Sequence, residues 1–175
     1  MKLIEIDKVR YRKHLNIIIV GFIGVFMFLA LVFGQGLIAI FSDVVATGEQ
    51  GSNFRYNLSG VILAFLACAV ILSQLREHHF FYEVYYIWRL KKVLNLIYRK
   101  LATIKVKAKQ NDISALVILN YYYQASQQLY LLDDNTITLS TLNKELGDLK
   151  DKIADLDVNI STDDFNQSML SVYTK

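Results

Sequence analysis

The sequence predicts an all-α membrane protein, in which a two-span transmembrane helical hairpin is followed by a cytosolic three-helix bundle or coiled-coil hairpin. Three observations support this fold class. Residues 15–41 and 58–75 are long runs without a charged side chain, the chain has no proline, and apolar residues recur at heptad spacing after the second run. A helix needs roughly 20 apolar residues to cross a bilayer, and an internal proline would break it.

Changes in composition divide the 175 residues into six segments. They are a basic cytosolic N-terminal flank (1–14), transmembrane helix 1 (15–42), a short external loop (43–56), transmembrane helix 2 (57–76), a cytosolic helical domain (77–160) and a polar C-terminal tail (161–175). The first apolar run is too long for the apolar part of a signal peptide, so we expect an uncleaved anchor. The polar tail is expected to fray.

The distribution of charge predicts the orientation of both spans. Five basic and two acidic residues precede the first run, whereas the segment 42–57 between the runs has one basic and two acidic residues. Residues 76–110 have nine basic and two acidic side chains, and the rest of the chain is acidic. Positive charge is retained on the cytoplasmic side of a membrane. We therefore expect a multi-pass protein with both termini in the cytoplasm.

Three helices are expected in the cytosolic region. No glycine or proline lies between Val61 and Lys109, so the second span can continue out of the membrane as one long helix. The polar residues 110–112 end that pattern and offer an N-cap for a second helix from Ile113 to about Leu132. A third helix is expected to begin near Thr138.

Two of these helices have an apolar seam at alternating spacings of three and four residues, which is typical of coiled coils. The seam of the first comprises Ile87, Leu90, Leu94, Ile97 and Leu101, and that of the third comprises Leu139, Leu142, Leu146, Leu149, Ile153 and Leu156. The sequence leaves open whether these seams pair within one chain or between chains.

Small residues share one face in each apolar run: Ala30 and Gly34 in the first, and Gly60, Ala64 and Cys68 in the second. Such faces let the backbones of membrane helices approach closely. They either pack the two spans of one chain together or mediate oligomerisation. Cys68 is the only cysteine, so an internal disulfide is excluded and a buried structural thiol is expected.

A basic run follows the second span and contains the candidate contacts for anions or lipid. These candidates are Lys91, Lys92, Arg99, Lys100 and Lys105. They could bind anionic lipid headgroups or the phosphates of a nucleotide or nucleic acid. Alternatively, they only mark the cytoplasmic side and pair with the acidic third helix.

Other motifs favour structural roles over chemistry. The aromatic stretch 78–88 indicates an interfacial belt, in which His78, His79 and Glu83 are polar residues and not metal ligands. Tyr121, Tyr122 and Tyr123 point in three directions on a helix, so packing is favoured over base stacking. The sequence has no phosphate-binding loop and no metalloprotease or nucleophile motif. We therefore expect no catalytic residue, no cofactor and no metal.

Residues 6–16 (IDKVRYRKHLN) and 53–61 (NFRYNLSGV) are unusual for plain flanks of membrane spans. Together they resemble a family of short gammaproteobacterial membrane proteins of unknown function, with two spans followed by a helical cytoplasmic part. The resemblance implies location in the bacterial inner (cytoplasmic) membrane. It implies no activity, cofactor or site residues.

The sequence therefore favours a non-enzymatic inner-membrane anchor or assembly protein, whose cytosolic helical domain self-associates or docks a membrane-protein partner. The lipid bilayer is its expected surrounding, and either a homo-oligomer or a complex with a membrane-protein partner is expected. The alternative is a ligand-responsive membrane effector that binds an anionic nucleotide through its basic cytosolic helix.

Overall fold

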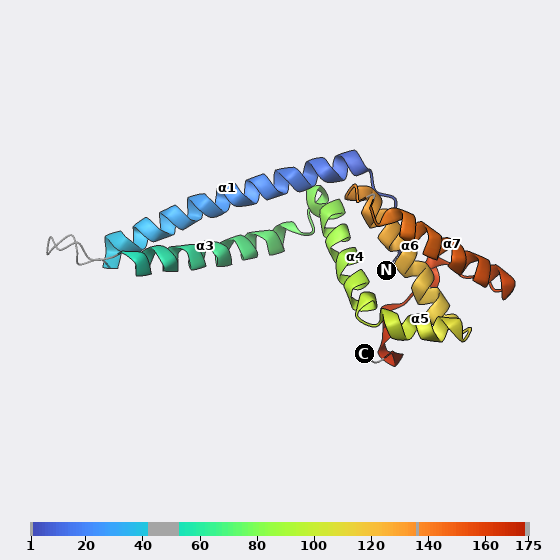
Figure 1. Ribbon diagram of the computed structural model, residues 1–175. Coiled ribbons are helices and arrows are strands. Elements are labelled where there is room, and N and C mark those ends of the chain that lie inside the picture. The colour runs from blue at the N-terminus through green and yellow to red at the C-terminus, as the bar shows by residue number, and fades with distance from the viewer. Residues whose placement is uncertain (1, 42–52, 136, 174–175) are drawn as a thin grey trace. The chain divides into compact units, whose positions relative to one another are not determined.

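The computed structural model describes residues 2–41, 53–135 and 137–173, and every regular element in these ranges is a helix (Figure 1). The elements are α1 (Lys8–Phe41), α3 (Phe54–Leu75), η1 (His79–Phe81), α4 (Tyr82–Tyr98), α5 (Leu101–Lys109), α6 (Ile113–Leu132), α7 (Leu139–Asp155), η2 (Thr162–Asp164) and η3 (Gln167–Val172). They form two compact units: the apolar hairpin (Arg12–Tyr82), and the helical body, which joins Met1–Tyr11 to Glu83–Lys175.

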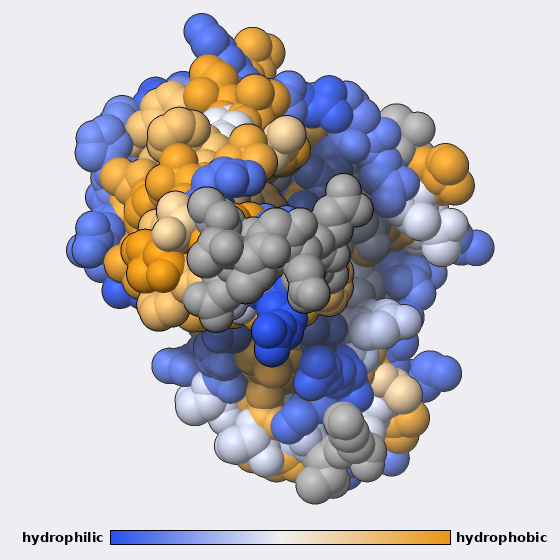
Figure 2. Space-filling view, turned by 90° about the vertical axis from the view of Figure 1, so that its left-hand side faces the viewer, coloured by the Kyte–Doolittle hydropathy of each residue, from blue (hydrophilic) through white to orange (hydrophobic). Residues whose placement is uncertain are grey.

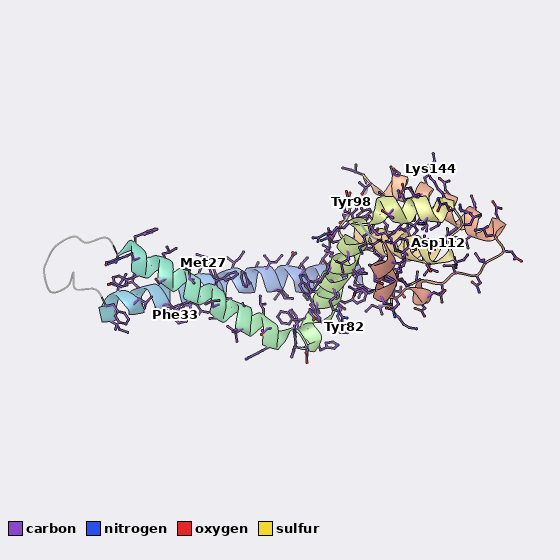
Figure 3. The ribbon with its side chains drawn as sticks, turned by 90° about the horizontal axis from the view of Figure 1, so that it is seen from below. Met27, Phe33, Tyr82, Tyr98, Asp112 and Lys144 are labelled. Carbon is purple, nitrogen blue, oxygen red and sulfur yellow. The ribbon has the colours of Figure 1, made fainter. Side chains whose placement is uncertain are left out.

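The apolar hairpin contains the two runs that the sequence predicts as spans. Helices α1 and α3 are both long and apolar enough to cross a membrane. Their apolar side chains project outward along the helices, and Met27 is 60% exposed (Figure 3). Most of the predicted external loop 43–56 lies outside the described residues, and α3 already begins at Phe54.

The expectation of one long helix from the second span to Lys109 is wrong. α3 ends at Leu75, and the extended residue His78 accepts a hydrogen bond at Nδ1 from the backbone N–H of Phe80, 3.2 Å away. This side chain caps a new helical segment, so it interrupts the helix without glycine or proline. A second break separates α4 from α5 at Lys100, whose Nζ donates to the carbonyl of Leu170 at 2.7 Å.

α6 begins at Ile113 and ends at Leu132, as predicted, and Asp112 is its N-cap. The Asp112 carboxylate accepts a hydrogen bond of 2.9 Å from the backbone N–H of Ala115. The helix is buried on several sides, and α5, α7 and η2 pack against it. α6 is therefore the centre of the helical body.

The heptad seams lie largely in the interior of a single chain. The buried seam residues are Ile87, Leu90, Leu94 and Ile97 in α4 and Leu142, Leu146 and Leu149 in α7. The seam continues in α5, where Ile104 and Ala108 are buried. Leu101, Leu139, Ile153 and Leu156 are half-buried. These residues therefore pack within the helical body.

The N-terminal segment is part of the helical body and not a separate flank. The Tyr86 hydroxyl accepts a hydrogen bond from the Ile4 N–H at 3.1 Å, and Gln128 donates to the Ile4 carbonyl at 2.5 Å. The Arg10 guanidinium lies 3.1 Å from the carboxylate of Glu83, which is buried. These contacts link the segment to α4 and α6.

The C-terminal tail does not fray as expected. Phe165, Leu170 and Tyr173 are buried, and the Phe165 ring stacks on Tyr121 with 4.1 Å between the centroids. Ser161 and Asn166 cap the two short helices η2 and η3. The polar composition of the tail therefore conceals three apolar anchors.

Tyr121 is fully buried, and its hydroxyl has no hydrogen-bond partner among the described residues. A buried hydroxyl without a partner costs about 1–3 kcal/mol of stability. Tyr86, in contrast, accepts from the N–H of Ile4 and donates to the carbonyl of Lys2, 3.3 Å away. The hydroxyl of Tyr86 therefore stabilises the fold, whereas that of Tyr121 lowers its stability.

We predict that Tyr121→Phe leaves the free energy of unfolding unchanged or raises it by about 1 kcal/mol, because it removes an unpaired hydroxyl. The matched control, Tyr86→Phe, should lower it by about 1–3 kcal/mol, because the Ile4 N–H loses its acceptor. Urea denaturation of the full chain in mild detergent, followed by fluorescence of the single tryptophan Trp88, measures both. Equal losses for the two variants would contradict this assignment.

Burial raises the pKa of Tyr121 well above its ordinary value of 10.0, and the nearby Tyr86 adds to the shift. Burial also raises the pKa of Tyr122, Tyr123 and Tyr173. Above about pH 10 the unfolded chain releases protons that the folded body retains, so stability falls as pH rises. We predict that the urea midpoint, measured by circular dichroism, falls between pH 9 and pH 11. The fall should be smaller in Tyr121→Phe, and an equal fall would refute the role of this residue.

Candidate functional site

The two helices of the apolar hairpin touch at the small residues that the sequence singles out. A Cβ atom added to Gly60 would lie 2.5 Å from the backbone N of Gly34 and 2.6 Å from its Cα. Gly34, Gly60, Ala64 and Cys68 are buried, and Ala30 is half-buried. The structure therefore brings these faces together within one chain, where glycine permits the contact.

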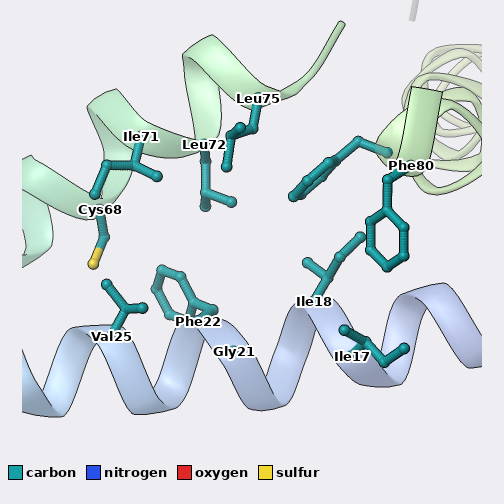
Figure 4. A pocket seen from close by; sticks show the side chains of 11 residues that line it. Ile17, Ile18, Gly21, Phe22, Val25, Cys68, Ile71, Leu72, Leu75 and Phe80 are labelled. Atoms are coloured by element: carbon teal, nitrogen blue, oxygen red, sulfur yellow. The ribbon is translucent and has the colours of Figure 1, made fainter. Parts of the chain in front are cut away.

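A cavity of about 210 Å³ lies between the same helices, toward the end of α3 at Leu75 (Figure 4). Ile18, Phe22 and Val25 of α1 face Cys68 and Leu72 of α3 across this space. The Phe80 ring closes one end and packs on His14, with 4.2 Å between the ring centroids. The cavity offers apolar walls and a thiol, and it is suited to an apolar group only.

Intramolecular partners engage three of the five candidate anion contacts. The ammonium group of Lys91 lies 2.9 Å from the Asp133 carboxylate, and that of Lys105 lies 2.7 Å from Glu145. Lys100 donates to the carbonyl of Leu170. Although burial alone would lower the pKa of Lys105, its hydrogen bond to Glu145 and the neighbouring Tyr123 outweigh this and raise that pKa. These three lysines thus have partners within the helical body, and ion pairs as exposed as these contribute little to its stability.

The fourth candidate, Lys92, lies in a different setting. Its Nζ is 5.7 Å from the centre of the Trp88 ring, and Arg89 lies over the Tyr85 ring at 6.0 Å. The Tyr85 and Trp88 rings are stacked, with 5.8 Å between their centroids. We call these four residues of α4 the aromatic–basic face. The fifth candidate, Arg99, is exposed at the junction with α5.

The described residues contain no group of three or more His, Cys, Asp or Glu side chains that could hold a metal ion. His78 is a helix cap, and Glu83 is in contact with Arg10. Tyr121 and Tyr123 are buried, and Tyr122 is half-buried, which fits packing better than base stacking. These histidine, glutamate and tyrosine side chains therefore take part in capping, ion pairing and packing.

A family model described as "Protein of unknown function (DUF3087)" matches residues 1–170, nearly the whole chain. The chain belongs to the DUF3087 family. The match confirms the resemblance to an uncharacterised family, and it includes both units of this DUF3087 protein. No curated protein and no solved structure matches the chain.

Sequence reasoning missed two features of this DUF3087 protein. It did not pair Arg10 with Glu83, although an acidic residue within an aromatic stretch signals a buried partner. It did not separate Arg89 and Lys92, which lie on aromatic rings, from the lysines that pair with carboxylates. No sequence signal distinguishes these neighbouring bases, because their partners are distant along the chain.

We predict that Gly60→Ala destabilises the apolar hairpin by about 1–3 kcal/mol, because the new methyl group meets backbone atoms of Gly34 that cannot yield. Gly24→Ala is the matched control, because a Cβ there has no atom within 4 Å. Cys68 is the only thiol and is buried, so its labelling by a maleimide dye on heating reports when the hairpin opens. Labelling should begin at a lower temperature in Gly60→Ala alone, and identical curves for the two variants would rule out the close contact.

Proposed function

We propose that this protein is a non-enzymatic membrane anchor and assembly protein of the bacterial inner membrane. The apolar hairpin crosses the bilayer twice, and the helical body docks a membrane-protein partner on the cytoplasmic side. One observation carries the proposal. In the most apolar windows of α1 and α3, only 6% and 17% of the residues are buried. The core helix of a soluble protein is mostly buried, so these helices need lipid around them.

The surface of the hairpin supports this assignment. Hydrophobic residues gather on its outside (Figure 2). They include Val20, Phe28, Leu31 and Phe65, which are exposed by 60–70%. Contiguous apolar surface of this kind is costly in water and favourable in hydrocarbon. The helices contact each other at glycines, as membrane helices commonly do.

The charges at the two ends of the hairpin support the cytoplasmic orientation. Arg12 and Lys13 lie at the start of α1, and Arg76 follows the end of α3. Since α1 and α3 run antiparallel, these positive residues lie at the same end of the hairpin (Figure 1). Positive residues favour the cytoplasmic side, which would hold both termini there.

The packing of the heptad seams favours docking over self-association. A coiled coil between chains needs seams that are free to pair. Here the central seam residues of α4 and α7, such as Ile97 and Leu146, are already buried in one chain. The nucleotide-binding alternative also loses support, because Lys100 and Lys105 are engaged within the chain.

We predict that the full chain stays in the membrane pellet after alkaline carbonate extraction, and that a green fluorescent protein fused to its C-terminus is fluorescent. In mild detergent the purified protein should have the mass of one 20.1 kDa chain after correction for bound detergent. Extraction by carbonate would overturn the anchor. A dark periplasmic fusion would overturn the orientation, and a stable oligomer would restore self-association.

A further inference from the structure

We infer that the aromatic–basic face of α4 (Tyr85, Trp88, Arg89 and Lys92) binds the anionic headgroups of the bilayer in which the protein is anchored. The inference rests on the proposed membrane anchoring, and it names a ligand class and a binding surface. The occupant is a phospholipid surface that carries negative charge.

The four residues lie on one side of α4. Tyr85 is followed by Trp88 three residues later, by Arg89 after four and by Lys92 after seven, a spacing that aligns side chains on one helix face. Trp88 is 57% exposed, whereas Ile87 and Leu90 beside it are buried in the helical body. The inner side of α4 thus packs the core, and the outer side presents two aromatic rings to the surroundings.

The two cations of this face differ from Lys91 and Lys105, the lysines of α4 and α5 that pair with carboxylates. Lys91 and Lys105 have carboxylate partners, but no carboxylate of the described residues forms a salt bridge with Arg89 or Lys92. Each instead lies over an aromatic ring. A cation on a ring is held in place without being neutralised, so it still attracts an anion. The face therefore carries positive charge that the fold does not compensate.

A hollow of about 270 Å³ adjoins these residues, and Val93, Leu96 and Gln167 complete its wall. It combines the two aromatic rings and two aliphatic side chains with a guanidinium, an ammonium and an amide. A phospholipid likewise has a charged part beside an apolar part, because its phosphate is joined to an apolar glycerol ester. A guanidinium binds phosphate oxygens in a bidentate manner, and aromatic rings favour the headgroup zone. The chemistry of the hollow matches that zone better than it matches a purely polar ligand.

The chain keeps this face close to the bilayer. α3 ends at Leu75, and Tyr85 is ten residues farther along. Ten residues span at most about 33–36 Å when fully extended, and η1 and the start of α4 shorten this. A surface tethered so close to the membrane meets lipid headgroups at high effective concentration. Weak contacts are then sufficient, and each basic residue near an anionic surface adds to binding.

The test uses the full chain in lipid nanodiscs, with phosphatidylcholine alone or with added phosphatidylglycerol. Trp88 is the only tryptophan, so its emission reports on the proposed surface. We expect phosphatidylglycerol to shift this emission to shorter wavelength and to increase its quenching by lipids brominated near the headgroup. In Arg89→Gln/Lys92→Gln, the phosphatidylglycerol fraction that gives half of the shift should rise about fivefold or more.

The matched control is Lys107→Gln/Lys109→Gln, which removes the same charge from two exposed lysines of α5. This variant should respond to phosphatidylglycerol as the parent protein does. An equal loss in both double variants would show a general effect of net charge and would overturn the assignment. Trp88 emission that does not change with phosphatidylglycerol would also overturn the assignment. So would emission that shifts only when a soluble triphosphate nucleotide is added to phosphatidylcholine nanodiscs.

The same experiment separates the two proposals. Protein that does not enter nanodiscs at all would contradict the membrane anchor. Protein that enters them normally but keeps Trp88 accessible only to the aqueous quencher acrylamide would contradict the lipid-binding face alone.

Discussion

The interior of the helical body is organised around α6, a helix whose buried residues occupy several of its sides. Eight of the nine residues from Ala115 to Tyr123 are buried, so no single neighbouring helix can cover α6. The apolar seams of α5 and α7 cover two sides, and η2 packs on another. Phe165 then places its ring on Tyr121. The folding of a polar C-terminal tail onto the protein follows from this need for cover.

The apolar hairpin differs from the helical body, because most of its apolar side chains are exposed. Its side chains are apolar on the outside, and its helices touch through glycine and alanine. A backbone contact at Gly34 and Gly60 buries little apolar surface, so the hydrophobic effect that stabilises the helical body in water gives this unit little stability there. In hydrocarbon the same close contact is favourable, because packing and not solvent release drives association. The hairpin helices are long and apolar enough to cross a membrane, whereas the helical body buries its apolar residues.

Sequence reasoning succeeded where a feature is local and periodic. Asp112 is followed at once by an apolar segment, so the cap and the start of α6 at Ile113 could be predicted. The first and third helices were found from their spacing of three and four residues. The breaks at His78 and Lys100 could not be found in this way. At His78 the side chain caps the next helical segment, whereas the Lys100 side chain forms no cap and has a distant backbone partner. For Lys100 the partner is Leu170, which is remote in sequence and identifiable only in the fold.

The basic region shows why charge alone is a poor guide to function. Lys91 and Lys92 are adjacent, yet helical geometry places the first beside Asp133 and the second over Trp88. Adjacent positions on a helix point about 100° apart, so one base can pair with a carboxylate of the helical body while its neighbour lies over an aromatic ring. Net charge counts both equally. Lys91 and Lys105 are the lysines of α4 and α5 that pair with acidic residues of the helical body. What remains on the outer side of α4 is held by aromatic rings, and this residual charge, not the total, determines which anions the surface can attract.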